Sequence, residues 1–375
     1  MLIAASVITT HMGKLKARWK LEGGIPPVPG QKVNTSITTG SALADIPLTW
    51  KKLDFTIPPP GAIGDVVQGT PDYAGTFVVY DWKTHQIIWQ SDWGNRLVTP
   101  AGVCFADGFL YVADLEGANL FRIDANGDPG TLVKRISHPY LNDVHSLERT
   151  TRGLLTTCSG NDLIIELDME GNAVWEWWAA EHGFNVSPSG NSQTAGRGKE
   201  HRDQYYHTRY QSTHLNCANV RDPGDDSLIL AMIFHQGLLV EIDRSLPPED
   251  QKPRVILEGL ARPHGLEKIP GGWLLANSLA KELLLLDEDL AIASRIDYDG
   301  GWIQDCTRLP NGNILLNDVD NHVLVEFAGP PWKIDFQMNY DPEWRMGELV
   351  VVPQPHEQAF SAIGERQEGL TSVRG

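Results

Sequence analysis

Three polar residues begin copies of the same short pattern of apolar runs and turns. In each copy the first residue lies 23 positions before the residue that ends the third apolar run, and the pairs are His145 and Asp168, His264 and Asp287, and Asp305 and Ala328. His214 stands 29 residues before Asp243, and the enlarged turn RDPGDDS accounts for the extra six. The shared spacing predicts that these four residues occupy equivalent places in a repeated fold.

Imidazoles at such places could bind a metal. Neutral imidazole nitrogens bind divalent transition metals, and three histidines that leave a position open form a catalytic rather than a structural pattern. The sequence therefore predicts a divalent metal ion (zinc, iron or manganese) on His145, His214 and His264. Such an ion would lower the pKa of a bound water or polarise a substrate carbonyl. Asp143 and Asn216, each two residues from a predicted ligand, are expected to support the imidazoles by hydrogen bonds.

Two further residues are candidates near the same place. Asp305 could be a fourth metal ligand or the general base, and we predict a catalytic role for it. His235 follows the second apolar run of its copy and is predicted to face the substrate. The competing interpretation is structural, because a single histidine at such a position is usually a hydrogen-bonded part of the fold.

An insertion, residues 179–212, interrupts the repeats. Its first half is rich in Gly and Ser, and its second half, HRDQYYHTRY, is rich in His, Arg and Tyr. A loop of this length is usually functional or disordered, so two interpretations stay open: a lid over one end of the fold, or a solvated loop. As a lid it would supply Tyr206 and His207 for proton transfer and Arg209 for binding an anionic substrate.

The repeats themselves predict the fold. The third apolar run ends at Asp81, Asp124, Asp168, Asp243, Asp287 and Ala328, with intervals of 43, 44, 75, 44 and 41 residues. Each copy holds about four short, β-branched and aromatic runs between Gly, Asn, Asp or Pro. Four strands in about 42 residues, six times over, predict an all-β six-bladed β-propeller rather than one of seven blades, with the insertion between blades 3 and 4.

This fold fixes where the candidate residues should lie. The propeller is expected over residues 62–336, with extensions at 1–61 and 337–375 that can supply ring-closing strands. The first strand of each blade lines the central channel, so His145, His214, His264 and Asp305 should meet at one channel mouth. By the same count, blade 2 offers Ala101 and blade 1 offers Pro58.

Several segments resemble known propeller repeats. ADGFLYVADLEGANLFRID and LPNGNILLNDVDNHVLVEF resemble NHL and SMP-30-type repeats, and GNAVWEWW followed by STHLNCANV resembles arylsulfotransferase-type propellers. The resemblance covers the six repeats and implies the propeller fold. It also implies two chemistries, because some of these propellers hold a channel metal on histidines and arylsulfotransferase-type ones use a channel histidine as nucleophile. Either role could fall to His145, His214 or His264.

Composition limits the partners. The net charge of −17 argues against nucleic acid and against an anionic membrane surface. The first 20 residues lack the pattern of a signal peptide, and no apolar run reaches the roughly 18 residues that span a bilayer. The four cysteines form no CxxC pair and are expected to be free thiols. These features favour a cytoplasmic protein with a small-molecule substrate, and they do not indicate an oligomeric state.

The sequence thus favours an enzyme: a metal-dependent lyase or hydrolase that acts on a small organic molecule at the channel mouth. The first alternative is metal-free group transfer by a channel histidine. The only arginines near the predicted channel strands, Arg152 and Arg308, fall in turns, and this counts against a cationic clamp on a transferred anion. The second alternative is a non-catalytic propeller that binds a protein partner.

Overall fold

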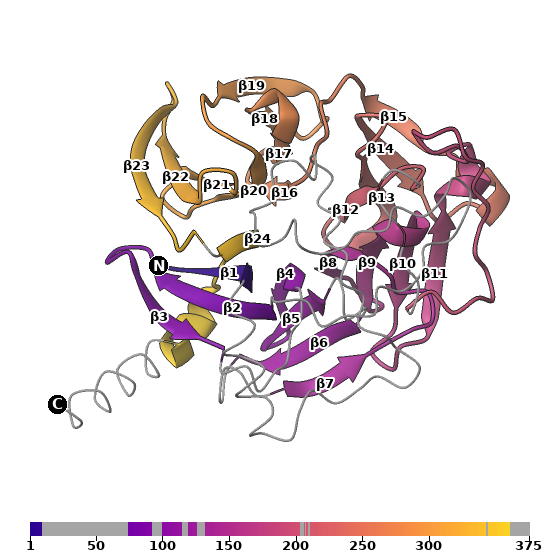
Figure 1. Cartoon of the computed structure of the whole chain (residues 1–375), viewed down its shortest axis with the longest axis horizontal. Helices are drawn as coiled ribbons and strands as arrows, with labels where there is room; N and C mark the ends of the chain where they lie inside the picture. The colour runs from indigo at the N-terminus through magenta and orange to yellow at the C-terminus, as the bar shows by residue number, and fades with distance from the viewer. Residues whose placement is uncertain are drawn as a thin grey trace.

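The computed structural model describes residues 1–9, 74–91, 100–114, 119–125, 132–202, 206, 208, 211–342 and 344–360. This part of the chain forms six four-stranded antiparallel sheets arranged around a central axis (Figure 1). The predicted six-bladed β-propeller is confirmed, and so is the insertion between blades 3 and 4. The third strands of the blades end at the predicted residues or one residue earlier.

Blades 2 to 6 each consist of four strands that follow one another in the chain. Blade 2 holds β4 (Pro100–Ala106), β5 (Phe109–Asp114), β6 (Asn119–Asp124) and β7 (Leu132–Ile136). Blade 3 holds β8 (Val144–Arg149), β9 (Leu154–Cys158), β10 (Leu163–Leu167) and β11 (Ala173–Trp178). Blade 4 holds β12 (Leu215–Asp222), β13 (Asp225–Ile233), β14 (Leu238–Asp243) and β15 (Arg254–Leu257). Blade 5 holds β16 (Leu266–Ile269), β17 (Gly272–Asn277), β18 (Glu282–Leu286) and β19 (Ile292–Asp297). Blade 6 holds β20 (Ile303–Arg308), β21 (Ile314–Asp318), β22 (Val323–Ala328) and β23 (Lys333–Asn339).

Blade 1 joins segments from the two ends of the chain. Its strands lie in the order β24 (Trp344–Val351), β1 (Leu2–Thr9), β2 (Ala74–Asp81) and β3 (Gln86–Gln90). Figure 1 shows β24, in yellow, beside β1, in indigo. β24 lies next to β20 and β4, so it is the innermost strand of its blade. Full closure of the ring leaves no open edge between the first and last blades.

Helical structure is sparse in the described residues. Four short 3-10 turns are η2 (Ser159–Asn161), η3 (Ala179–His182), η5 (Pro248–Asp250) and η6 (Ser278–Ala280), and residues 354–360 are helical. In the part of the chain that the structure describes, none of the helices has the length and apolar character needed to cross a bilayer.

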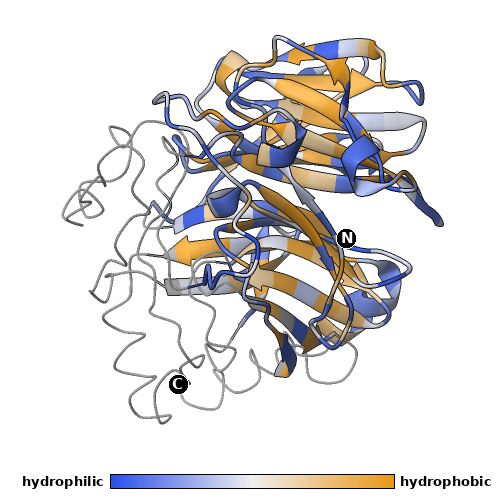
Figure 2. Ribbon diagram, turned by 90° about the vertical axis from the view of Figure 1, so that its right-hand side faces the viewer, coloured by the Kyte–Doolittle hydropathy of each residue, from blue (hydrophilic) through white to orange (hydrophobic). Residues whose placement is uncertain are grey.

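The hydrophobic core is divided among the blade interfaces. Each of six large clusters of buried apolar side chains lies between two neighbouring blades. The middle strands pack on a neighbour through both faces, which is why LIIEL and ILLND are buried at every position rather than at alternate ones. Figure 2 shows many hydrophobic residues along the strands and mainly hydrophilic residues in the connecting loops.

Acidic side chains join the innermost strands of neighbouring blades. An innermost strand has no further strand beside it toward the channel, so its N–H groups need other acceptors. Glu348, Glu148 and Glu267 each accept a backbone N–H from the next blade. The donors are Val103 at 2.8 Å, Val220 at 2.6 Å and Arg308 at 2.9 Å, respectively. Asp305 accepts the N–H of Leu349 at 2.7 Å and so links blade 6 to blade 1.

Candidate functional site

The four predicted channel residues belong to the innermost strands or to the loops before them. His145 is the second residue of β8, and Asp305 is the third residue of β20. His214 directly precedes β12, and His264 lies two residues before β16. The residues come from four successive blades. His145, His264 and Asp305 line one cavity at the axis, whereas His214 is fully buried beside His145.

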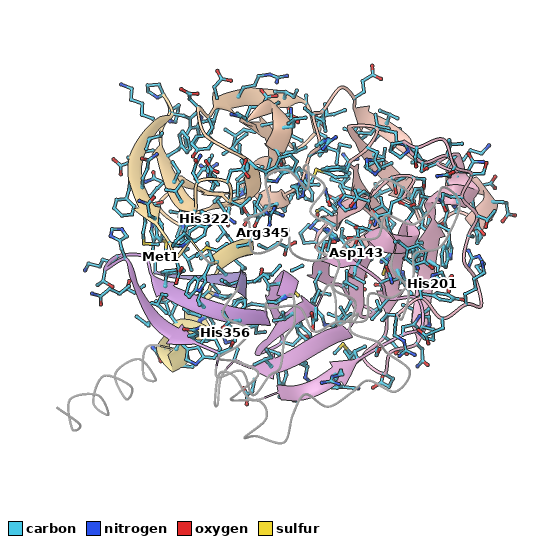
Figure 3. The ribbon with its side chains drawn as sticks, in the orientation of Figure 1. Met1, Asp143, His201, His322, Arg345 and His356 are labelled. Carbon is cyan, nitrogen blue, oxygen red and sulfur yellow. The ribbon has the colours of Figure 1, made fainter. Side chains whose placement is uncertain are left out.

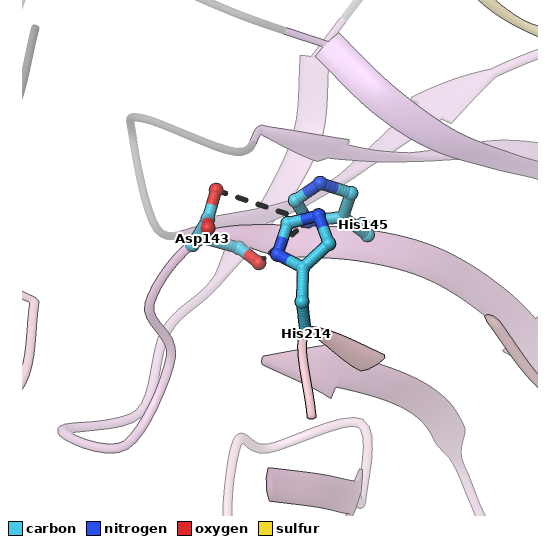
Figure 4. A group of neighbouring side chains, drawn as sticks. All are labelled: Asp143, His145 and His214. Atoms are coloured by element: carbon cyan, nitrogen blue, oxygen red, sulfur yellow. Dashed lines mark hydrogen bonds and ion pairs between the residues drawn. The ribbon is translucent and has the colours of Figure 1, made fainter. Parts of the chain in front are cut away.

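His145, His214 and Asp143 form a compact group of potential metal ligands (Figure 4). One donor atom from each lies within 4.8 Å of the other two. The two imidazole rings meet nearly edge to face, with centroids 4.9 Å apart. His264 is in no donor group of this kind among the described residues, because the ring of Phe234 lies 4.8 Å from His214 and 5.3 Å from His264 and separates the two.

Hydrogen bonds fix the tautomer of His145. Its Nδ1 lies 2.9 Å from the backbone oxygen of Asp143 and 3.0 Å from the hydroxyl of Ser159. The Ser159 hydroxyl donates its own hydrogen to the backbone oxygen of Leu215, so both partners of Nδ1 are acceptors. Nδ1 therefore carries the hydrogen of the neutral ring, and the lone pair is on Nε2.

The tautomer of His214 is fixed by Gln211. The Gln211 amide nitrogen donates to the carboxylate of Asp143 at 3.1 Å and to the backbone oxygen of Tyr206 at 2.7 Å. Its oxygen therefore faces His214 and accepts a hydrogen bond from Nδ1 at 2.5 Å. The lone pair of His214 is on Nε2, a buried atom without a hydrogen-bond partner in the described structure.

The backbone around His214 is held by one carboxylate. Asp162 is 5% exposed and accepts five hydrogen bonds from Ser212, Thr213 and His214, at 2.5 to 3.0 Å. His214 has a φ of 50° and Asp143 has a φ of 51°, in the left-handed region that non-glycine residues seldom adopt. A conformation of this kind persists only where its surroundings enforce it, and Asp162 does so for His214.

Burial keeps two of the imidazoles neutral. It lowers the pKa of His214 well below its ordinary value, and charges on His145 and His235 would lower it further. His264 packs edge-on against Trp302, with ring centroids 5.0 Å apart, and its Nδ1 has no partner among the described residues. Burial, with the nearby His145, lowers the pKa of His264 to about 3. At neutral pH both rings are therefore able to offer a lone pair to a metal or a donor.

A cavity of about 60 Å³ opens beside this group at the axis. That space holds a few water molecules or one small functional group. Its polar lining includes His145, His264, Gln304, Asp305, Arg345 and Glu348.

Two acids in this lining have altered proton affinities. Burial raises the pKa of Asp305 to about 7, against the opposing effect of the Leu349 N–H. Burial and the neighbouring Asp305 raise the pKa of Glu348 well above its usual range. The pair therefore holds a proton near neutral pH and can exchange one.

Arg345 and Glu348 were missed from the sequence. Both belong to β24, the innermost strand of blade 1, and Figure 3 shows Arg345 near the axis across from Asp143. The sequence count had placed Pro58 there, and Pro58 lies outside the described residues. A signal was present, because the same three-residue step separates Arg345 from Glu348, His145 from Glu148 and His264 from Glu267.

The other predicted residues have varied surroundings. Asn216 donates to the backbone oxygen of Pro263 at 3.0 Å, and its buried Oδ1 has no partner among the described residues. The ring of His235 is 5.9 Å from that of His214, and its Nε2 is 2.9 Å from the backbone oxygen of Thr208. His207 and Arg209 lie outside the described residues.

The described part of the insertion packs on the loop before β8. The N–H of His201 donates to Pro139 at 2.8 Å, and the amide of Asn142 donates to the backbone oxygen of His201 at 2.6 Å. Tyr206, predicted as an acid or base, has its hydroxyl 2.7 Å from Nδ1 of His201. The insertion is therefore attached at the His145 end of the channel, and Gln211 at its end contacts Asp143 directly.

Comparison with known proteins finds solved structures that are similar at low identity and no closer relationship. No protein-family model and no curated protein matches the chain. Among solved structures, virginiamycin B lyase from Staphylococcus aureus is similar, with 10% identity, coverage of 68% of this chain and 95% of that one, and a TM-score of 0.44. A streptogramin B lyase shows 14% identity, 64% and 83% coverage and a TM-score of 0.43. The WD40 propeller domain of Doa1 shows 12% identity, 67% and 70% coverage and a TM-score of 0.43. The chain resembles these β-propeller proteins in fold alone.

Proposed function

We propose that the protein is a metal-dependent enzyme that acts on a small organic molecule at the His145 end of its channel. The observation that carries the proposal is that His214, a member of the group of three donor residues, has a buried Nε2 without a partner among the described residues. Two imidazoles and the carboxylate of Asp143 suit zinc, iron or manganese. Asp143 takes the place of His264 in this set, because the ring of Phe234 lies against both His214 and His264.

The surroundings of these donors support the same proposal. Gln211 and Ser159 hold the two Nδ1–H groups, as the outer hydrogen bonds of metal-binding histidines commonly do. A bound divalent ion would supply a water of lowered pKa or a polarised carbonyl. Asp305, whose pKa of about 7 is set by burial, would give or take the proton that a lyase or hydrolase reaction requires.

Metal analysis tests the proposal. Protein purified without chelator, or refilled with zinc, iron or manganese, should hold about one equivalent of metal. His214→Ala should abolish this binding, and Gln211→Leu should weaken it by about 10- to 100-fold because Nδ1 loses its acceptor. His85→Gln, on an exposed turn of blade 1, is the matched control and should bind like the wild type. A wild-type protein that binds no more of these metals than His214→Ala would contradict the proposal.

A second candidate, metal-free group transfer by His214, is favoured by Arg345. The sequence showed no arginine at the channel, and the structure places one in the cavity wall. In this reaction Nε2 of His214 would attack the sulfur of an aryl sulfate, forming an N–S bond while the S–O bond to the phenolate breaks. Mass spectrometry of chelator-treated protein with 4-nitrophenyl sulfate should then show a sulfuryl adduct that His214→Ala lacks. Absence of an adduct in the wild type would remove this candidate.

The cytoplasm is the compartment that we propose for the protein. All four cysteines are among the described residues, and none forms a disulfide. Unpaired thiols suit a reducing compartment.

A further inference from the structure

We propose that Arg345 binds an oxyanion of the substrate, so that the enzyme acts on small organic anions. This inference rests on the proposed function and names the substrate class for the same site. It concerns a residue that contributes no donor to the metal group, and it can therefore be tested separately.

Arg345 is a buried cation that forms no ion pair within the described part of the chain. Its side chain borders the cavity, and its buried Nη2 has no hydrogen-bond partner in the described structure. None of the ion pairs among the described residues includes it. The nearby Asp320 accepts the backbone N–H of Trp302 at 3.0 Å. Withdrawing a guanidinium from water is unfavourable unless an anion compensates its charge.

The acids of the cavity wall are engaged elsewhere. Asp305 accepts the N–H of Leu349, and Glu348 accepts the N–H of Val103. Burial raises the pKa of both carboxyl groups, so they oppose the charge of Arg345 only weakly at neutral pH. Arg345 is thus the one permanently charged cation among the described residues that line the cavity, in a protein whose net charge is −17. A metal ion on His145 and His214 would add to this positive charge.

The other polar groups of the cavity indicate which groups the substrate carries beside its anionic group. Gln304 Oε1 and Asn216 Oδ1 are buried acceptors without a partner among the described residues, and both residues line the cavity. Substrate hydroxyl, amide or amino groups would satisfy them. The charge of Arg345 contributes to the low pKa of His264, which places the two side chains near each other. A carboxylate with one or two adjacent polar carbons fits a space of about 60 Å³.

A carboxylate and a sulfate or phosphate share the chemistry that a guanidinium recognises. The test therefore uses acetate, lactate, malate, sulfate and phosphate, with acetamide and lactamide as neutral counterparts, at constant ionic strength. Binding is measured by calorimetry and by the shift of Tm. The variants are Arg345→Gln and Arg345→Lys, and the control is Arg295→Gln, which removes an exposed arginine paired with Glu282 on blade 5.

The wild type and Arg295→Gln should bind at least one carboxylate and not its neutral counterpart. Arg345→Gln should weaken this binding by at least tenfold, and Arg345→Lys should restore part of it because a lysine keeps the charge but loses the planar fork. Binding of sulfate or phosphate alone, again lost in Arg345→Gln, would assign an ester of that acid as the substrate.

Two outcomes would overturn the inference. One is a wild type that binds none of these anions more tightly than chloride. The other is an Arg345→Gln variant that is folded by circular dichroism and binds them as tightly as the wild type. The metal content of the same variants separates this result from the proposed function. His214→Ala should lose metal and keep some anion binding, whereas Arg345→Gln should keep the metal.

Discussion

Replacing Glu267 with glutamine should change how stability depends on pH. The Glu267 carboxylate accepts the N–H of Arg308 and the hydroxyl of Thr307, both at 2.9 Å, and joins blade 5 to blade 6. Glutamine can keep both contacts, because its oxygen accepts the N–H and the Thr307 hydroxyl can reverse to accept from the amide. The variant therefore removes the titration while it preserves the blade contact.

The magnitude follows from the shift in proton affinity. Burial raises the pKa of Glu267 from 4.5 to about 7. The folded protein holds this proton more tightly than the unfolded chain does. The contribution of the protonated Glu267 side chain to the free energy of unfolding is therefore complete below about pH 4.5 and is lost as the pH rises through 7. At 1.36 kcal/mol per pKa unit, the loss is about 3 kcal/mol. Relative to the wild type, Glu267→Gln should become more stable by about this amount between pH 4.5 and 8.

Urea denaturation at half-unit steps of pH, for wild type and variant, gives this difference directly. Subtracting the two curves cancels the opposing titration of the buried histidines, whose lowered pKa values make the wild type less stable in acid. Glu288→Gln, at an exposed turn, controls for the loss of one carboxylate. A difference between Glu267→Gln and wild type that stays constant from pH 4.5 to 8 would refute the reasoning.

Two further predictions concern the framework of the site. Asp162→Asn should destabilise the protein by about 2–4 kcal/mol in urea denaturation, because an amide nitrogen cannot accept the N–H and hydroxyl hydrogens of residues 212–214. An unchanged midpoint would mean that the loop does not depend on this carboxylate. Gly102→Ala should lower Tm and cost about 1–3 kcal/mol, because its Cβ would lie 2.6 Å from the backbone carbon of Ser146 in the next blade. A variant as stable as the wild type would show that blades 2 and 3 can separate at little cost.

The fold was predictable because its signals are local. Asp168 shows why: its carboxylate accepts the N–H groups of Glu170 and Asn172 in the turn that follows strand three. A turn of this kind favours Asp or Asn at a fixed position, so an Asp returns at the same phase in five of the six copies, with Ala328 in the sixth. The apolar runs between the turns are short and buried on both faces, which is characteristic of strands packed between other sheets.

The closing strand was not predictable in the same way. β24 pairs with β1, more than 300 positions earlier in the sequence, and no local pattern specifies such a partner. The count along the chain therefore assigned blade 1 the wrong innermost residue and overlooked Arg345. Because of this error, the predicted channel contained no arginine, and this counted against group transfer. The structure places Arg345 in the cavity wall and so removes that objection.

The site was predictable only to the level of the backbone. The spacing placed His145, His214 and His264 at equivalent positions, but spacing does not determine the direction of a ring. Phe234 stands between two of the three imidazoles, and it lies just after β13, where no count of strand starts would find it. Gln211 was likewise invisible, because its contact with Asp143 depends on how the insertion returns to the ring.

Ring closure and the candidate chemistry depend on the same strand. An innermost strand needs acceptors for its channel-facing N–H groups, and buried carboxylates supply them at four blade junctions. Burial raises the pKa of each of these acids, and it raises the pKa of Glu148, Glu267 and Asp305 to about 7, so these three can carry protons near neutral pH. Of the four, Asp305 and Glu348 border the cavity, and they meet at the junction that β24 completes. The strand that closes the ring therefore also brings the proton-exchanging pair and Arg345 to the side of the axis opposite His145.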